Sequence, residues 1–131
     1  MIDDIDRQSL IEYRIGQATE TIELARFLLS SEKLVVAVNR IYYGMYYALT
    51  ALALKYKFET SKHSQLIGWF NKEFIANKQI DTKFGKSLRV AFANRTKGDY
   101  DAFIEFSVQE VALMLTEMVD FIEEIKKILN Q

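Results

Sequence analysis

The amino-acid sequence predicts an all-α protein, an antiparallel up-and-down bundle of four to five helices in a single domain over residues 1–131. Apolar residues recur at three- and four-residue spacing almost throughout the chain. The chain has no proline and only five glycines, so few residues would interrupt a long helix. The segments between the periodic stretches are short, which favours antiparallel neighbours.

The first half of the chain is expected to form two long helices. The first spans about residues 7–30, where apolar side chains line one face. Ser30 or Ser31 can end that helix and cap the next. The second covers "LVVAVNRIYYGMYYALTALALKYK", which is apolar on nearly every face and is therefore predicted to be the most buried. Its β-branched "VVAV" could form a strand, but the segment is too long for one.

A third, shorter helix is expected after the loop "FETSKHSQ", with Thr60 or Ser61 as its cap. A turn at "NKQID" follows, and Asp81 is the predicted cap of a fourth helix over residues 82 to about 97. The apolar members of the third helix are Leu66, Trp69, Phe70, Phe74 and Ile75.

Gly98 is predicted to end the fourth helix, because glycine readily takes the left-handed conformation of a helix C-terminus. The chain would then reverse within "KGDYD", and Asp99 or Asp101 would cap a fifth helix over about residues 102–129.

Composition excludes several function classes. The net charge of -1 is not that of a general nucleic-acid binder, which would be basic overall. Without cysteine and with a single histidine, a metal site is not expected, nor is a cofactor. The start of the chain lacks the features of a signal peptide, and "YYALTALAL" is too short to span a bilayer. A cytoplasmic protein without membrane contact is therefore predicted.

Positive charge gathers between residues 82 and 98, where no acidic residue occurs. The five positive residues are Lys83, Lys86, Arg89, Arg95 and Lys97. They form either a solvated helix face, balanced by the acidic residues that follow, or a phosphate-binding stripe that leads along the helix to Arg95.

Arg95 and Tyr100 are the candidate catalytic residues. On an unbroken helix they would lie about 140° apart, but a reversal at Gly98 would fold Tyr100 back toward Arg95. Alternatively, "KGDYD" is only a connection between helices, with Arg95 bonded to Asp99. Asn94, Lys97 and Asp99 are candidate binding residues beside this pair.

Further candidate binding residues are His63, Asn39 and Tyr43. His63 starts the third helix, where the helix dipole should lower its pKa and favour the neutral ring; the alternative is a half-buried structural histidine. Tyr43 belongs to a group of four tyrosines within six residues. Asn39, one turn earlier, could bond its hydroxyl, although the group could simply pack in a core or interface.

Three segments in order, "AVNRIYYGMYYALTALAL", "KHSQLIGWFNKEFI" and "LRVAFANRTKGDYD", resemble the small stand-alone HEPN-domain proteins of bacteria and archaea, from about residue 7 to the end. The resemblance implies a four- or five-helix bundle, usually a homodimer. Many members are toxins or ribonucleases, and many sit beside a minimal nucleotidyltransferase that acts as partner or antitoxin.

Ribonuclease members of that family share an arginine followed, four to six residues later, by a histidine, and the two copies face each other in the dimer. Arg95 matches the arginine, with Asn94 as its polar neighbour, but Tyr100 stands where the histidine would be. A phenol with a pKa near 10 is a poor general base at neutral pH. The arginine alone can still hold a phosphate.

Three functions therefore remain open. The first is a HEPN-type nucleotide- or RNA-binding protein that acts with a nucleotidyltransferase partner in a toxin–antitoxin-like system. The second is a metal-independent ribonuclease using Arg95 and Tyr100, with help from Asp99. The third is a non-catalytic dimeric interaction module. A homodimer is expected through the surface that carries Arg95 and the tyrosine-rich helix.

Overall fold

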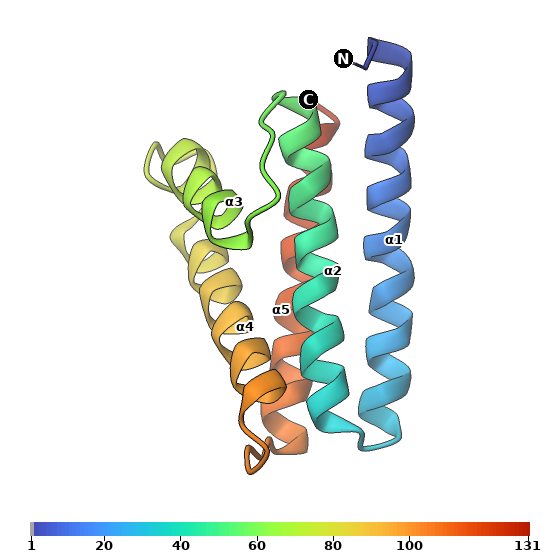
Figure 1. Cartoon of the computed structure of the whole chain (residues 1–131), viewed down its shortest axis with the longest axis vertical. Helices are drawn as coiled ribbons and strands as arrows, with labels where there is room; N and C mark the ends of the chain where they lie inside the picture. The colour runs from blue at the N-terminus through green and yellow to red at the C-terminus, as the bar shows by residue number, and fades with distance from the viewer. Residues whose placement is uncertain (1) are drawn as a thin grey trace.

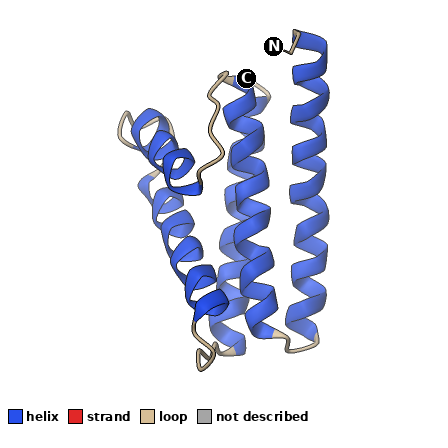
Figure 2. Cartoon of the chain, viewed as in Figure 1, coloured by secondary structure: helices blue, strands red, loops and turns tan. Residues whose placement is uncertain are grey.

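A computed structural model describes residues 2–131, which form five α-helices and one short π-helical segment without any strand (Figure 1, Figure 2). The predicted all-α helical bundle is confirmed. The elements are α1 (Asp4–Ser30), α2 (Leu34–Lys55), α3 (His63–Phe70), η1 (Asn71–Ile75), α4 (Thr82–Tyr100) and α5 (Val108–Leu129).

The long helices alternate in direction along the chain, and α2 is the central one (Figure 1). It contacts all four other α-helices. The sequence explains this position, because α2 is apolar over most of its surface and buries half of its residues. At Gly44 the absence of a side chain lets α5 and α1 approach, since a Cβ there would overlap Met118 and lie 3.3 Å from Thr21 Cγ2.

Three helices begin at the side-chain caps that satisfy their free N–H groups. Asp3 accepts from Asp6 N–H, Asp81 accepts from Lys83 N–H as predicted, and Ser107 accepts from Glu110 N–H. The caps predicted for the second and third helices, Ser30 or Ser31 and Thr60 or Ser61, are wrong. The N-cap positions of α2 and α3 are Lys33 and Lys62, and neither makes a side-chain capping bond.

The predicted reversal at Gly98 is also wrong. The fourth helix continues through Gly98 to Tyr100, and no glycine in residues 2–131 has a positive φ. Instead, Gly98 allows α4 to lie close to α2, because a Cβ there would be 3.3 Å from Val35 Cγ1. The chain turns after Asp101, whose N–H still bonds to Lys97 O. Thus α5 begins at Val108 rather than near residue 102, and its cap is neither Asp99 nor Asp101.

Two cations cover helix C-termini at the end of the bundle opposite this turn. Arg7 Nη1 donates to Leu54 O at 3.0 Å, and Lys55 Nζ donates to Ile128 O at 2.8 Å and Leu129 O at 3.2 Å. These carbonyls lie in the last turns of α2 and α5, where the helix dipole has its negative end. Leu54 O and Ile128 O also accept from the N–H groups of Lys57 and Gln131 in the turns that follow.

In the part of the chain that the structure describes, no helix has the length and apolar character needed to cross a membrane.

Candidate functional site

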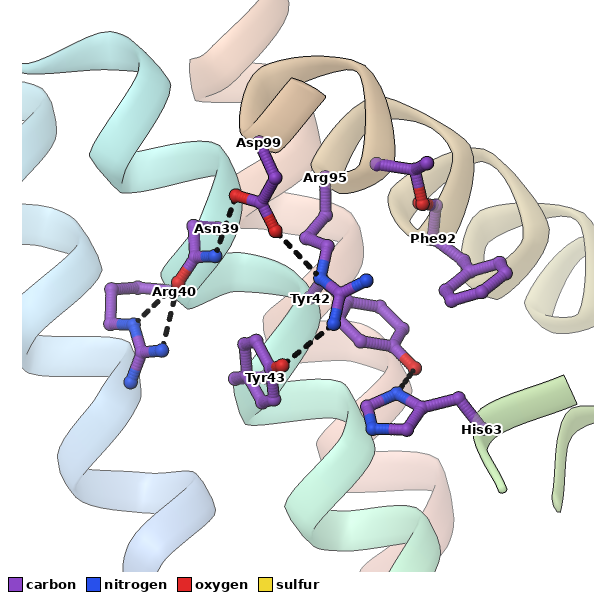
Figure 3. Close-up of polar contacts among 9 residues, drawn as sticks. Asn39, Arg40, Tyr42, Tyr43, His63, Phe92, Arg95 and Asp99 are labelled. Atoms are coloured by element: carbon purple, nitrogen blue, oxygen red, sulfur yellow. Dashed lines mark hydrogen bonds and ion pairs between the residues drawn. The ribbon is translucent and has the colours of Figure 1, made fainter.

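Arg95 projects from α4 onto the tyrosine-rich face of α2 (Figure 3). Its Nη2 donates to the Tyr43 hydroxyl at 2.7 Å. Its Nε lies 3.2 Å from Asp99 Oδ2 in an ion pair that is not an aligned hydrogen bond. The guanidinium carbon also lies 5.3 Å, 5.2 Å and 5.8 Å from the ring centres of Tyr42, Tyr43 and Phe92. The side chain is therefore held on several sides at once.

The Arg95 side chain is 16% exposed, and one of its nitrogens remains available. Nη1 makes no hydrogen bond within residues 2–131, and it is not among their buried atoms without a partner. It therefore reaches solvent. Burial opposes the charged form of Arg95, but the Tyr43 hydrogen bond and the nearby Asp99 charge outweigh it and raise the pKa. The site thus offers a permanent cation with one free nitrogen, Nη1, which carries two N–H donors.

Asp99 is positioned in turn by Asn39. Asn39 Nδ2 donates to Asp99 Oδ1 at 3.2 Å, while Asn39 Oδ1 accepts from Arg40 Nε at 3.0 Å and Nη2 at 2.8 Å. The prediction that Asn39 bonds the Tyr43 hydroxyl is wrong, because Arg95 is the partner of that hydroxyl. Arg40, whose guanidinium lies 4.9 Å from the Tyr43 ring centre, was not anticipated from the sequence.

His63 lies on the other side of the same rings. Its Nδ1 is 2.6 Å from the hydroxyl of Tyr42, and its ring stacks on that of Tyr46 with centres 4.1 Å apart. It starts α3 and is half-buried, as predicted. Burial lowers its pKa, and the charge of Arg95 lowers it further. The prediction of a neutral ring agrees with this direction.

Three predicted site residues lie away from this cluster. Tyr100, at the end of α4, is 83% exposed and makes no hydrogen bond within the described chain. Because the helix is unbroken at Gly98, the predicted meeting of Arg95 with Tyr100 does not occur within one protomer. Lys97 is exposed on the last turn of α4, and Asn94 donates to Met114 Sδ on α5 at 3.8 Å.

The remaining basic residues of α4, Lys83, Lys86 and Arg89, are all exposed. They are spaced three apart along the helix, so they follow one side of it. Ser87, between them, donates to Glu117 Oε2 of α5 at 2.9 Å, so at least one acidic side chain of α5 lies near these three residues.

The chain is similar to several known proteins. Residues 11–130 match the HEPN domain family. A "UPF0332 protein" of Thermotoga maritima is 34% identical over 125 residues, which cover 95% of each chain. Two proteins of Methanocaldococcus jannaschii are also similar. "Putative toxin MJ0142" is 34% identical over 91% of this chain and 81% of its own, and "Putative toxin MJ0605" is 27% identical over 95% and 89%.

Proposed function

This chain belongs to the HEPN domain family, and on that basis we propose that it is a toxin-like protein that binds a phosphate group of RNA or of a nucleotide at Arg95. A minimal nucleotidyltransferase is its proposed partner in a toxin–antitoxin-like system. Two relatives named as toxins support the first part of this proposal. The family resemblance supports the partner.

The observation that carries the proposal is the arrangement around Arg95. Tyr43 and Asp99 fix the guanidinium through Nη2 and Nε, and Nη1 is left free for a ligand. A guanidinium bonds phosphate oxygens strongly, and one that is already oriented loses less entropy when it binds. Within residues 2–131, Asp99 is the one carboxylate that forms an ion pair with Arg95.

Binding fits the geometry better than cleavage does. Tyr42, the phenol beside His63, is buried, and burial raises its pKa well above the usual value. The phenol therefore keeps its proton at neutral pH and cannot act as a general base. Tyr100 of the same protomer is exposed beyond the site. A metal-independent cleavage by Arg95 and Tyr100 would therefore need Tyr100 from a second copy.

A homodimer through the surface around Arg95 is part of the proposal. Exposed apolar side chains lie near the start of α2 and just after the end of α4. They are Val36, which is 50% exposed, and Phe103, which is 92% exposed, and exposed apolar patches often mark interaction surfaces. Sedimentation at micromolar concentration should show a dimer, and Phe103→Glu should shift it toward monomer. A wild-type monomer would remove the dimer from the proposal.

The direct test measures binding of a fluorescent single-stranded RNA at fixed salt concentration. Arg95→Ala should weaken binding by about tenfold or more, because a hydrogen bond to a charged group contributes ~1.5–3 kcal/mol. Arg26→Ala is the matched control. It also removes one positive charge, but Arg26 is exposed on α1 and, among the residues that the structure describes, forms an ion pair with Glu23 alone. Equal affinities for the two variants would contradict a phosphate site at Arg95 and would favour the interaction-module alternative.

A further inference from the structure

The hydroxyl of Tyr42 restricts where the proton on His63 can be. Tyr42 is fully buried, and within residues 2–131 its hydroxyl has one hydrogen-bond partner, His63 Nδ1 at 2.6 Å. His63 is also the chain's single histidine. The state of this one bond therefore decides the chemistry of the only imidazole in the protein.

A buried hydroxyl proton needs an acceptor, and leaving it without one costs about 1–3 kcal/mol. The lone pair of His63 Nδ1 is the acceptor within reach. If Nδ1 accepts, it carries no proton, and the neutral ring must hold its proton on Nε2. The reverse arrangement, with Nδ1–H donating to the Tyr42 oxygen, would leave the phenol proton buried and unpaired.

Nε2 of His63 is free to meet a ligand. It makes no hydrogen bond in the described part of the chain and is not among the buried unpartnered atoms there, so it reaches solvent. The ring itself is fixed by its stacking on Tyr46 at 4.1 Å and by the edge of Tyr43 at 5.9 Å. Its centre also lies 6.3 Å from that of Phe92, so His63 and Arg95 rest against the same rings.

We infer that Tyr42 is a positioning residue that fixes His63 with its proton on Nε2, so that the imidazole offers an N–H donor to the anion bound at Arg95. This inference rests on the proposed phosphate binding. In this state His63 donates a hydrogen bond rather than accepting a proton. His63 therefore does not act as the general base, the role of the histidine that ribonuclease members carry where this chain has Tyr100.

The groups around the ring oppose a second proton. Tyr42, Tyr43 and Tyr46 of α2 face it with their phenol rings, and Arg95 of α4 acts on it with a positive charge. A proton added to Nδ1 would also meet the phenol proton of Tyr42. No carboxylate forms an ion pair with His63 in residues 2–131.

Nitrogen NMR of histidine-labelled protein tests the proton position without any ligand. The single histidine gives one imidazole, so its two nitrogens need no further assignment among residues. At neutral pH we expect Nε2 to be protonated and Nδ1 to be an unprotonated acceptor. Tyr42→Phe should produce a mixture of the two tautomers. A wild-type ring protonated on Nδ1, or a Tyr42→Phe spectrum identical to wild type, would overturn the inference.

Binding of a fluorescent single-stranded RNA of ~12 nucleotides tests the donor role. His63→Ala should weaken binding about fivefold, the effect of one ordinary hydrogen bond. His63→Gln, whose amide N–H can reach the position of Nε2–H, should stay within about twofold of wild type. Thermal melting confirms that each variant is folded.

The two proposals fail in different ways. If Arg95→Ala weakens RNA binding and His63→Ala leaves it unchanged, the donor role is overturned and the proposed function stands. If neither variant changes binding, the proposed function fails and the donor role falls with it. The NMR result, obtained without RNA, still decides whether Tyr42 fixes the proton.

Discussion

Arg95 on α4 donates through Nη2 to the hydroxyl of Tyr43 on α2 at 2.7 Å. This bond joins residues that are 52 positions apart in the chain, and it sets the orientation of the guanidinium. Its contribution to stability and to binding can be measured separately.

Tyr43→Phe removes this bond and leaves the ring. We expect the free energy of unfolding in urea to fall by ~1.5–3 kcal/mol, since the lost bond involves a charged donor. Binding of RNA should weaken too, because Arg95 is less well oriented. Tyr47→Phe is the control, as the Tyr47 hydroxyl makes no hydrogen bond within residues 2–131. A similar loss in both variants would contradict the prediction.

Asp99→Asn separates the charge of Asp99 from its shape. The amide oxygen can still accept from Asn39, while the negative charge next to the Arg95 guanidinium is lost. Because Tyr43 still holds Nη2, the guanidinium stays oriented without the charge of Asp99. We therefore expect RNA to bind a few times more tightly at low salt concentration, with the gain shrinking as salt is added, because nearby charges are then screened. Fluorescence titrations at two salt concentrations measure this. Weaker binding at low salt would show that the carboxylate acts mainly as a positioning group.

The stability of the protein should depend on pH through His63. Its pKa in the folded state lies below the ordinary value, so the unfolded chain binds more protons in acid. Stability contributed by the neutral ring is therefore present above the unfolded pKa near 6.5 and is lost as the pH falls through the folded pKa. Urea unfolding at pH 7.5 and at pH 5 should show a larger drop for wild type than for His63→Gln. Equal drops would contradict the prediction.

Gly44→Ala should destabilise the bundle, because the new methyl group would overlap the end of Met118 and press on Thr21. Overpacking of this kind typically costs ~1–3 kcal/mol. Gly16→Ala is the matched control on α1, where a Cβ has no neighbour within 4 Å. There the better helix propensity of alanine should raise stability by ~0.5–1 kcal/mol. Thermal unfolding of both variants measures the contrast, and a stable Gly44→Ala variant would count against close packing at α2.

Periodicity alone was enough to predict most of the fold. The apolar spacing predicted the helices and the central place of α2, and the cap at Asp81 was correct. The end of α4 was not predictable in the same way. Glycine can end a helix or lie within one, and at Gly98 the close approach of Val35, a contact between distant segments, favours the second.

In the site, too, a contact between residues close in sequence was predictable, and contacts between helices were not. The pairing of Arg95 with Asp99 was predicted only as the alternative, within a connection between helices. It is present at 3.2 Å, but on one unbroken helix, where the two residues are four apart. The partner of Tyr43 was not foreseeable, because Asn39 is near it in sequence while Arg95 comes from another helix. The bond between Tyr42 and His63 likewise joins residues 21 apart, and no local pattern marks such a pair.

The contacts of Arg7 and Lys55 link the terminal turns of different helices. Arg7 of α1 bonds the last turn of α2, and Lys55 of α2 bonds the last turn of α5. Fraying of any one of these turns would break a contact with the next. The amide protons at this end should therefore exchange with solvent as one cooperative unit rather than helix by helix.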